Sequence, residues 1–170
     1  MTATPHPHIQ EALRFILDQK RQCWPTMPVI MVVDDHIGGM NNRGWYEARY
    51  HVENCHDYPE YISDLHDRLR EVYGSTITIY RVERAEVWRE IQHDANPYPE
   101  DEYIATSTCM NAIISFADLP MNQVDGGLVI LQMQVDVGDV IFEGHEGESE
   151  LVIKNPSEIK ALRYIGGEQK

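Results

Sequence analysis

Apolar residues recur at helical spacing in two stretches of the first half of the chain. The stretch IQEALRFILDQKRQ (9–22) has apolar residues three or four positions apart and basic residues at its end, so it predicts a helix. A second helix is predicted from Asp57, a candidate N-cap, to Gly74, a residue that commonly ends helices. Its apolar residues share one face: Ile62, Leu65, Leu69 and Val72.

Short apolar or alternating runs predict strands between and after these helices. PVIMVV (28–33) is interpreted as a strand, and the following DDHIGGMNNRG (34–44), with its glycines and asparagines, as a loop. TITIYR (76–81) alternates and is rich in β-branched residues, which indicates a strand. A short helix is predicted at 85–92, and the polar, proline-containing segment 93–102 is predicted to be a loop.

The second half of the chain is richer in strands. A strand is predicted at YIATST (103–108), followed by a short helix around MNAIISFA and a loop at 119–127. Four more β-runs follow, separated by glycines and by Asn155-Pro156: 128–137, 139–144, 150–155 and 158–165. Because helices come early and strands late, the pattern predicts an α+β fold with a mixed, largely antiparallel sheet.

Length and charge narrow the class of protein. The 170 residues, 42% of them hydrophobic, suit one globular domain, 1–170, with a helix-rich part at 1–75. The 28 acidic residues against 14 basic ones give a formal charge of −14, which works against sequence-independent binding to nucleic acid. The same charge is compatible with a basic protein partner, including one that a non-catalytic acidic protein would bind and block.

The cysteines and the apolar runs indicate the compartment. Three cysteines at wide, irregular spacings form neither a disulfide framework nor a zinc pattern. No apolar run approaches the roughly 20 residues that span a bilayer, and the first residues lack a leader pattern. We therefore expect a cytoplasmic protein without membrane contact, either in its producer or in a targeted host cell.

Two acidic residues at the start of an apolar run are the first candidates for a functional role. In GESELVI, Glu148 and Glu150 are two positions apart, so in a strand they would share one face at roughly 6 to 7 Å. Like charges this close repel each other, unless a function or a cation compensates for them. The structural alternative is an exposed strand end whose acids deter edge-to-edge pairing. Asp35 and His36 have no spaced partners, so we predict no metal site.

Two further positions come before this pair in a definite order. Arg81 ends a predicted strand, and Thr106-Ser107-Thr108 opens a strand-to-helix turn. Taken singly, Arg81 is typical of a structural ion pair, Ser107 of a helix cap, and the glutamates of a solvated strand end. The three positions together, in this order, are what indicates a function.

The combination resembles the arginine–serine–glutamate class of mono-ADP-ribosyltransferases, of the toxin-like and phage-like type. IYR (79–81) resembles the aromatic-then-arginine strand end of that family, and TSTCMNAIISFA (106–117) its Ser-Thr-Ser strand and following helix. VGDVIFEGHEGESELVIKNPSEIKALRYI (137–165) resembles its terminal block, in which a loop leads into Glu-x-Glu. The resemblance covers roughly 76–166. It implies a catalytic core of the family's β-sandwich type at 76–166.

The triplet can be aligned with the family's Ser-Thr-Ser in two ways. It corresponds either to Ser107-Thr108-Cys109, with the last serine replaced, or to Thr106-Ser107-Thr108, with both serines changed. We favour Ser107 as the lead serine, because this alignment keeps the serine and the threonine.

The resemblance implies NAD as substrate, no metal, and a role for each residue. Arg81 would bind the pyrophosphate through paired hydrogen bonds, and Ser107 would hydrogen-bond to the catalytic glutamate or the nicotinamide ribose, with Thr108 in support. Glu150 would stabilise the oxocarbenium-like ribose, and Glu148 would engage an acceptor such as an arginine guanidinium. Four aromatic residues are candidates to line the nicotinamide pocket or the core: Trp88, Tyr98, Tyr103 and Phe116.

Family members with Glu-x-Glu commonly modify arginine, so the resemblance implies a protein acceptor with an accessible arginine. Two alternatives remain open at this point. An NAD glycohydrolase would use water as the acceptor, and an acidic binding protein would not consume NAD at all. NAD-dependent removal of an RNA phosphate would require a basic face that this chain lacks.

Overall fold

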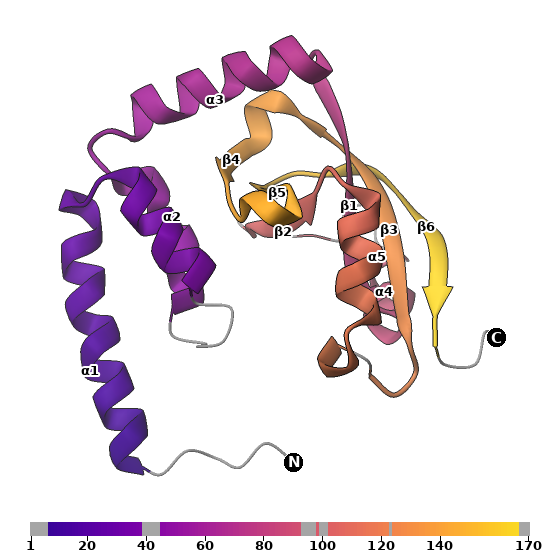
Figure 1. Ribbon diagram of the computed structural model, residues 1–170, viewed down its shortest axis with the longest axis horizontal. Coiled ribbons are helices and arrows are strands. Elements are labelled where there is room, and N and C mark those ends of the chain that lie inside the picture. The colour runs from indigo at the N-terminus through magenta and orange to yellow at the C-terminus, as the bar shows by residue number, and fades with distance from the viewer. Residues whose placement is uncertain (1–6, 39–44, 93–97, 99–101, 123, 167–170) are drawn as a thin grey trace. The chain divides into compact units, whose positions relative to one another are not determined.

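The computed structural model describes residues 7–38, 45–92, 98, 102–122 and 124–166. Within it the chain divides into two compact units, Met1–Ser63 and Asp64–Lys170 (Figure 1). Helix α3 (Tyr58–Tyr73) runs across this division. None of the described helices is long and apolar enough to cross a membrane.

The first unit is built from helices and short 3-10 turns. Helix α1 covers the predicted helix, and the described residues between it and α3 form one further helix and three turns. The core of this unit includes Trp24 and Val52, both fully buried. The elements are α1 (Pro7–Cys23), η1 (Trp24–Thr26), α2 (Val29–Gly38), η3 (Trp45–Tyr50) and η4 (Val52–Asn54).

The strand predicted at 28–33 is wrong, because this segment forms helix α2, which also takes in 34–38 of the predicted loop. Its buried residues are Val29, Val32, Val33 and His36, a spacing of i, i+3, i+4 and i+7 that is helical. The carboxylate of Asp57 accepts a hydrogen bond from the Val29 backbone N–H at 3.0 Å, at the first turn of the helix. Residues 39–44 of the predicted loop lie outside the described residues.

Asp35 joins three elements of the first unit. Its Oδ1 accepts a hydrogen bond from Lys20 Nζ at 2.7 Å, and its Oδ2 accepts one from Trp24 Nε1 at 2.9 Å. The side chain of Asp35 therefore has a structural role that links α1, η1 and α2.

The second unit contains the sheet. Its elements after α3 are β1 (Thr76–Arg84), α4 (Ala85–Ile91), β2 (Ile104–Ser107), α5 (Met110–Asp118), η5 (Pro120–Asn122), β3 (Leu128–Asp136), η6 (Val137–Asp139), β4 (Val140–Glu143), η7 (Glu146–Glu148), β5 (Glu150–Ile153) and β6 (Ser157–Ile165). The predicted strands and helices of the second half are confirmed, although their ends shift by a few residues. The predicted loop at 93–102 lies mostly outside the described residues.

The six strands form one sheet in the order β4-β5-β2-β1-β3-β6. All pairings among the described strands are antiparallel, so the α+β class is confirmed, but the sheet is antiparallel and not mixed. The β-sandwich arrangement stays a prediction. The described strands contain no parallel pair because of the position of β1. It lies between β2 and β3, so these two strands, which run in the same direction, are not neighbours.

Both faces of the sheet contribute to the core of the second unit, since Ile130 and Leu131, neighbours on β3, are both fully buried. Ile77 and Ile79 of β1 are fully buried and stand opposite Val135 and Met133 of β3. Alternate residues of a strand point to one face, so this register brings the four apolar side chains together.

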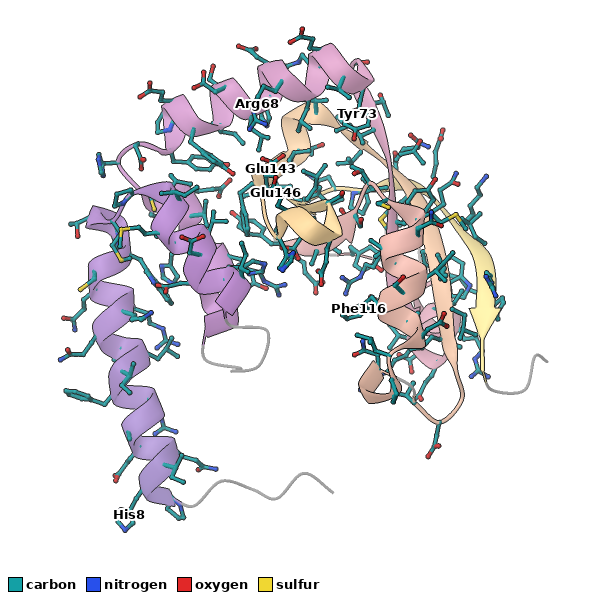
Figure 2. All side chains as sticks on the ribbon, in the orientation of Figure 1. His8, Arg68, Tyr73, Phe116, Glu143 and Glu146 are labelled. Atoms are coloured by element: carbon teal, nitrogen blue, oxygen red, sulfur yellow. The ribbon has the colours of Figure 1, made fainter. Side chains whose placement is uncertain are left out.

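Helix α3 is tied to β4, an edge strand of the sheet. His66 Nε2 lies 2.9 Å from the Val140 backbone oxygen, and Arg68 is 3.5 Å from the carboxylate of Glu143 (Figure 2). On the predicted apolar face of α3, Leu65 and Leu69 are buried, whereas Val72 is 72% exposed. The apolar face is therefore used only in part, and polar contacts to the edge strand supplement it.

Candidate functional site

Three strands that carry the candidate motifs lie side by side, although they are far apart in the sequence. Tyr80 of β1 is the register partner of Ser107 of β2, and Ser107 is the register partner of Glu150 of β5. Directly opposed residues of antiparallel strands point to the same face. Ser107 and Glu150 are therefore neighbours on one face of the sheet.

The carboxylate of Glu150 occupies a defined position beside the β4–β5 turn. Glu150 Oε1 accepts a hydrogen bond from the His145 backbone N–H at 3.1 Å. The backbones of Glu150, Gly144 and His145 are also paired, at 3.0 Å and 3.1 Å. A Cβ atom placed on Gly144 would lie 1.8 Å from Glu150 Oε1. The carboxylate thus fills the space that a side chain at residue 144 would need.

Glu148 does not share a strand with Glu150, so the prediction of two acids on one strand face is wrong. Glu148 ends the 3-10 turn η7, and Ser149 adopts the left-handed conformation with φ 49° and ψ 42°. The two-residue alternation holds only in extended backbone, and it is interrupted here. Glu148 is half-buried, and Glu146 at the other end of the same turn is exposed (Figure 2).

Ser107 acts on this turn through its hydroxyl group. The hydroxyl lies 2.5 Å from the backbone oxygen of Glu148, to which it donates, and accepts a hydrogen bond from the Cys109 N–H at 3.0 Å. We expected a bond to the carboxylate of Glu150 or to NAD; in this structure Ser107 instead holds the backbone of the glutamate turn. Thr108 adds a backbone N–H bond to the Ser149 oxygen at 3.2 Å.

The two alignments of the triplet place different residues beside Glu150. Thr106 is paired with Leu151, and its Oγ1 donates to the Leu151 backbone oxygen at 2.8 Å. Because neighbouring residues of a strand alternate, Thr106 points to the opposite face from Ser107. Ser107, the residue that we favour as the lead serine, is the one in register with Glu150.

Arg81 follows Tyr80 in β1, so its side chain points to the other face from Ser107 and Glu150. Its Nε donates to Glu83 Oε1 at 2.7 Å, and its Nη1 donates to the Ala105 backbone oxygen at 2.8 Å. Within the described residues β1 and β2 pair only at Tyr80 and Ser107. The guanidinium therefore bridges the two strands just beyond the point where their pairing ends, and it is not brought to the face of Glu150.

A buried polar cluster surrounds this guanidinium. Tyr98, only 6% exposed, donates its hydroxyl to Glu83 Oε1 at 3.2 Å, and the Arg81 Cζ lies 6.0 Å from the Tyr98 ring centroid. Burial lowers the pKa of Arg81, but the Glu83 carboxylate and the Tyr98 hydroxyl together raise it above its ordinary value. Burial is also the main reason that the pKa of Tyr98 is raised.

The other candidate aromatic residues lie in different surroundings. Trp88 is 8% exposed and belongs to the core, as does Tyr98. Phe116 is half-buried on α5, and its backbone oxygen accepts a bond from Asn122 Nδ2 at 2.8 Å (Figure 2). Tyr103 is half-buried just before β2.

Sequence reasoning missed two residues that shape the site, Gly144 and His145. The signal that could have found them is the glycine-rich turn EGHEGE, which must bring its backbone close to the following strand. His145 Nδ1 is buried and has no hydrogen-bond partner among the described residues.

The described side chains include no group of three or more His, Cys, Asp or Glu residues that could hold a metal ion. The three cysteines are free. Comparisons of the chain with protein-family models, with curated proteins and with solved structures found no match.

Proposed function

We propose that this protein is a mono-ADP-ribosyltransferase that moves ADP-ribose from NAD to an arginine side chain of a protein and releases nicotinamide. The observation that supports this proposal best is the register of Ser107 with Glu150 on neighbouring strands. Two motif residues that are distant in the sequence become adjacent, and the catalytic glutamate receives a fixed orientation from the turn before it.

Glu150 is the residue that would stabilise the reacting sugar. As the nicotinamide–ribose bond breaks, positive charge develops on the ribose, and a carboxylate held in place beforehand stabilises that charge without reorganisation. The bond from the His145 N–H to Glu150 Oε1 supplies this orientation. Ser107 would help to position Glu150, because its hydroxyl holds the backbone oxygen of Glu148 in the turn that precedes Glu150.

Glu148 would face the acceptor. It sits on the turn that precedes β5 and is half-buried. Among the described residues, its side chain has no hydrogen bond or ion pair, so its carboxylate is available to a guanidinium. The net charge of −14 favours the approach of a basic protein surface.

Arg81 would bind the diphosphate of NAD, although its present contacts limit how it does so. Two of its donors, Nε and Nη1, are bonded to Glu83 and to the Ala105 oxygen. A phosphate oxygen therefore uses Nη2 or displaces the Ala105 oxygen, which a charged acceptor can do because charge-assisted bonds are the stronger ones. The ligand would thus reach Arg81 at the opening between β1 and β2.

The test measures two products side by side. The purified chain is incubated with NAD labelled in its ADP-ribose part and with a cell lysate, and nicotinamide release and protein labelling are followed. Glu150→Gln keeps the shape but removes the charge, so we expect both products to fall by about 10²-fold or more. Glu146→Gln, an exposed acid on the same turn, is the matched control and should change neither product by more than about twofold.

Glu148→Gln separates transfer from hydrolysis. We expect it to reduce labelling strongly and to leave appreciable nicotinamide release, because water needs less positioning than a guanidinium. Nicotinamide release without any labelling in the wild type would instead indicate an NAD glycohydrolase. An absence of both products would contradict the proposal and favour a non-catalytic acidic binding protein.

A further inference from the structure

Helix α1 leaves most of its surface uncovered. From Pro7 to Ile16, every side chain of the helix that the structure describes is exposed. The half-buried ones among its described side chains come later in the helix: Leu17, Lys20 and Arg21. A helix of 17 residues is marginal in water unless one of its faces packs against another element. The uncovered part of α1 is therefore a candidate contact surface.

One side of this uncovered surface has no charged residue. Five exposed residues of α1 are spaced by three, four, three and four positions: Ile9, Ala12, Ile16, Gln19 and Cys23. This spacing keeps them on one line along the helix and is the spacing of the contact line in a two-helix coiled coil. Phe15, 62% exposed, lies beside this line. We call these six residues the α1 seam.

The seam combines exposed apolar side chains with an absence of charge. Ile9 and Ile16 are 54% and 43% exposed. Lys20 lies next to the seam, but its ammonium group is held by Asp35 at 2.7 Å. The helix as a whole has three basic and two acidic residues, a net charge of +1, whereas the chain has −14. Most of the surface should therefore repel a second copy of the chain, and α1 should not.

We propose that the α1 seam binds the same seam of a second copy of the chain, so that the protein forms a dimer. In a two-fold pair the same patch faces itself, and an uncharged apolar line is complementary to itself. A basic acceptor protein would instead be attracted by carboxylates, which the seam does not contain. The inference uses neither NAD nor the sheet, so it can fail or succeed independently of the proposed function.

The length of α1 limits the strength of this dimer. Its 17 residues span about 25 Å, and one pair of such helices is a small contact beside the roughly 1,200–2,000 Å² of a stable interface. We therefore expect a weak dimer that forms at high protein concentration. Salt screens the repulsion between two chains of charge −14 but not the apolar contact, so salt should strengthen the dimer.

The experiment is sedimentation of the full chain over a range of concentrations. The wild type should be monomeric near 1 µM and largely dimeric near 200 µM, both values being order-of-magnitude estimates for a weak contact of about this size. Ile16→Glu places a charge on the seam and should weaken the dimer by at least about tenfold. Gln10→Glu adds the same charge at an exposed position of α1 outside the seam, so this control should change the dissociation constant by no more than about twofold.

A second seam variant and the salt dependence complete the test. Ile9→Glu, near the start of the seam, should weaken the dimer as Ile16→Glu does, and circular dichroism verifies that each variant is folded. Raising NaCl from about 0.05 M to about 0.5 M should tighten the wild-type dimer. A wild type that stays monomeric at the highest concentration overturns the proposal. So does a dimer that both seam variants leave intact, that Gln10→Glu weakens equally, or that salt dissociates.

Discussion

The hydrogen atom that Gly144 carries in place of a side chain leaves room for the carboxylate of Glu150. The atoms that an added Cβ would meet belong to the Glu150 side chain and not to the backbone. A long side chain can rotate away at small cost, so a larger residue at 144 should move the carboxylate without unfolding the strand pair. The position of the proposed catalytic group thus depends on a residue in a different part of the turn.

Gly144→Ala is therefore expected to lower NAD cleavage by about tenfold or more, since the displaced carboxylate loses its orientation toward the ribose. Gly138→Ala is the control, because an added Cβ at residue 138 has nothing within 4 Å. Nicotinamide release and urea unfolding would be measured for both variants. Wild-type cleavage by a folded Gly144→Ala protein would show that the orientation of Glu150 does not matter for the reaction.

Arg81 holds Glu83 and the Ala105 oxygen in the fold and is proposed to bind the diphosphate of NAD, and a lysine should be weaker in both roles. Arg81→Lys keeps the charge but loses the forked geometry that bonds both Glu83 and the Ala105 oxygen. We expect the free energy of unfolding to fall by about 1 kcal/mol and the KM for NAD to rise. Arg84→Lys, at an exposed position of the same strand, is the comparison. If Arg84→Lys raises the KM and Arg81→Lys does not, phosphate binding belongs to Arg84.

At the scale of elements, the Arg81–Glu83–Tyr98 cluster makes the second unit sensitive to alkaline pH. Burial raises the pKa of Tyr98, whereas a tyrosine of the unfolded chain titrates near its ordinary value of about 10. Above that pH the unfolded chain loses a proton that the folded chain keeps. The unfolded state then binds fewer protons, so the free energy of unfolding falls as the pH rises.

Tyr98→Phe removes this titration. Urea unfolding between roughly pH 9 and 11 should show a shallower loss of stability in Tyr98→Phe than in the wild type. Near neutral pH, Tyr98→Phe should be less stable by about 1 kcal/mol, because it lacks the bond to Glu83. Parallel pH profiles for the two proteins would mean that Tyr98 does not cause the alkaline loss.

The elements of the second unit could be predicted because each carries a local signal. β1 alternates, α3 has a helical apolar face, and glycines or proline separate the late strands. The segment at 28–33 could not be predicted in this way. A six-residue apolar run is compatible with a buried strand and with a buried helix, and only the position of His36, further along, completes the helical pattern.

The sequence pointed to candidate residues on three strands, but it did not predict how those residues lie relative to one another. The order of Arg81, Ser107 and Glu150 identified three strands, yet nothing local to them determines that β1 lies between β2 and β3, or that Arg81 turns away from Ser107. The left-handed Ser149 removed Glu148 from the strand, and a serine gives no sequence signal of that conformation. Pairing partners and backbone exceptions are set by the tertiary structure.

For the whole molecule, the proposed chemistry is electrostatic and uses only this chain's side chains and NAD. We therefore expect NAD cleavage to continue unchanged after dialysis against a chelator, because the carboxylate of Glu150 supplies the charge stabilisation. Nicotinamide release before and after EDTA treatment is the measurement. Loss of activity that zinc or magnesium restores would reject this part of the mechanism.

A reduction of protein labelling by high salt, with NAD cleavage intact, would fit an acceptor attracted by the charge of −14.

The strand order also determines when the proposed site can exist. β1, β2 and β5 meet side by side, but β5 ends at Ile153 and is made after α5, β3 and β4 have been added to the chain. Pairings between strands that are distant in sequence form slowly, and a chain emerging from the ribosome folds from its first residues onward. A chain whose synthesis has stopped before β5 therefore carries Arg81 and Ser107 but no Glu150 beside them. The proposed activity therefore cannot begin before the chain has been made as far as Ile153, the end of β5.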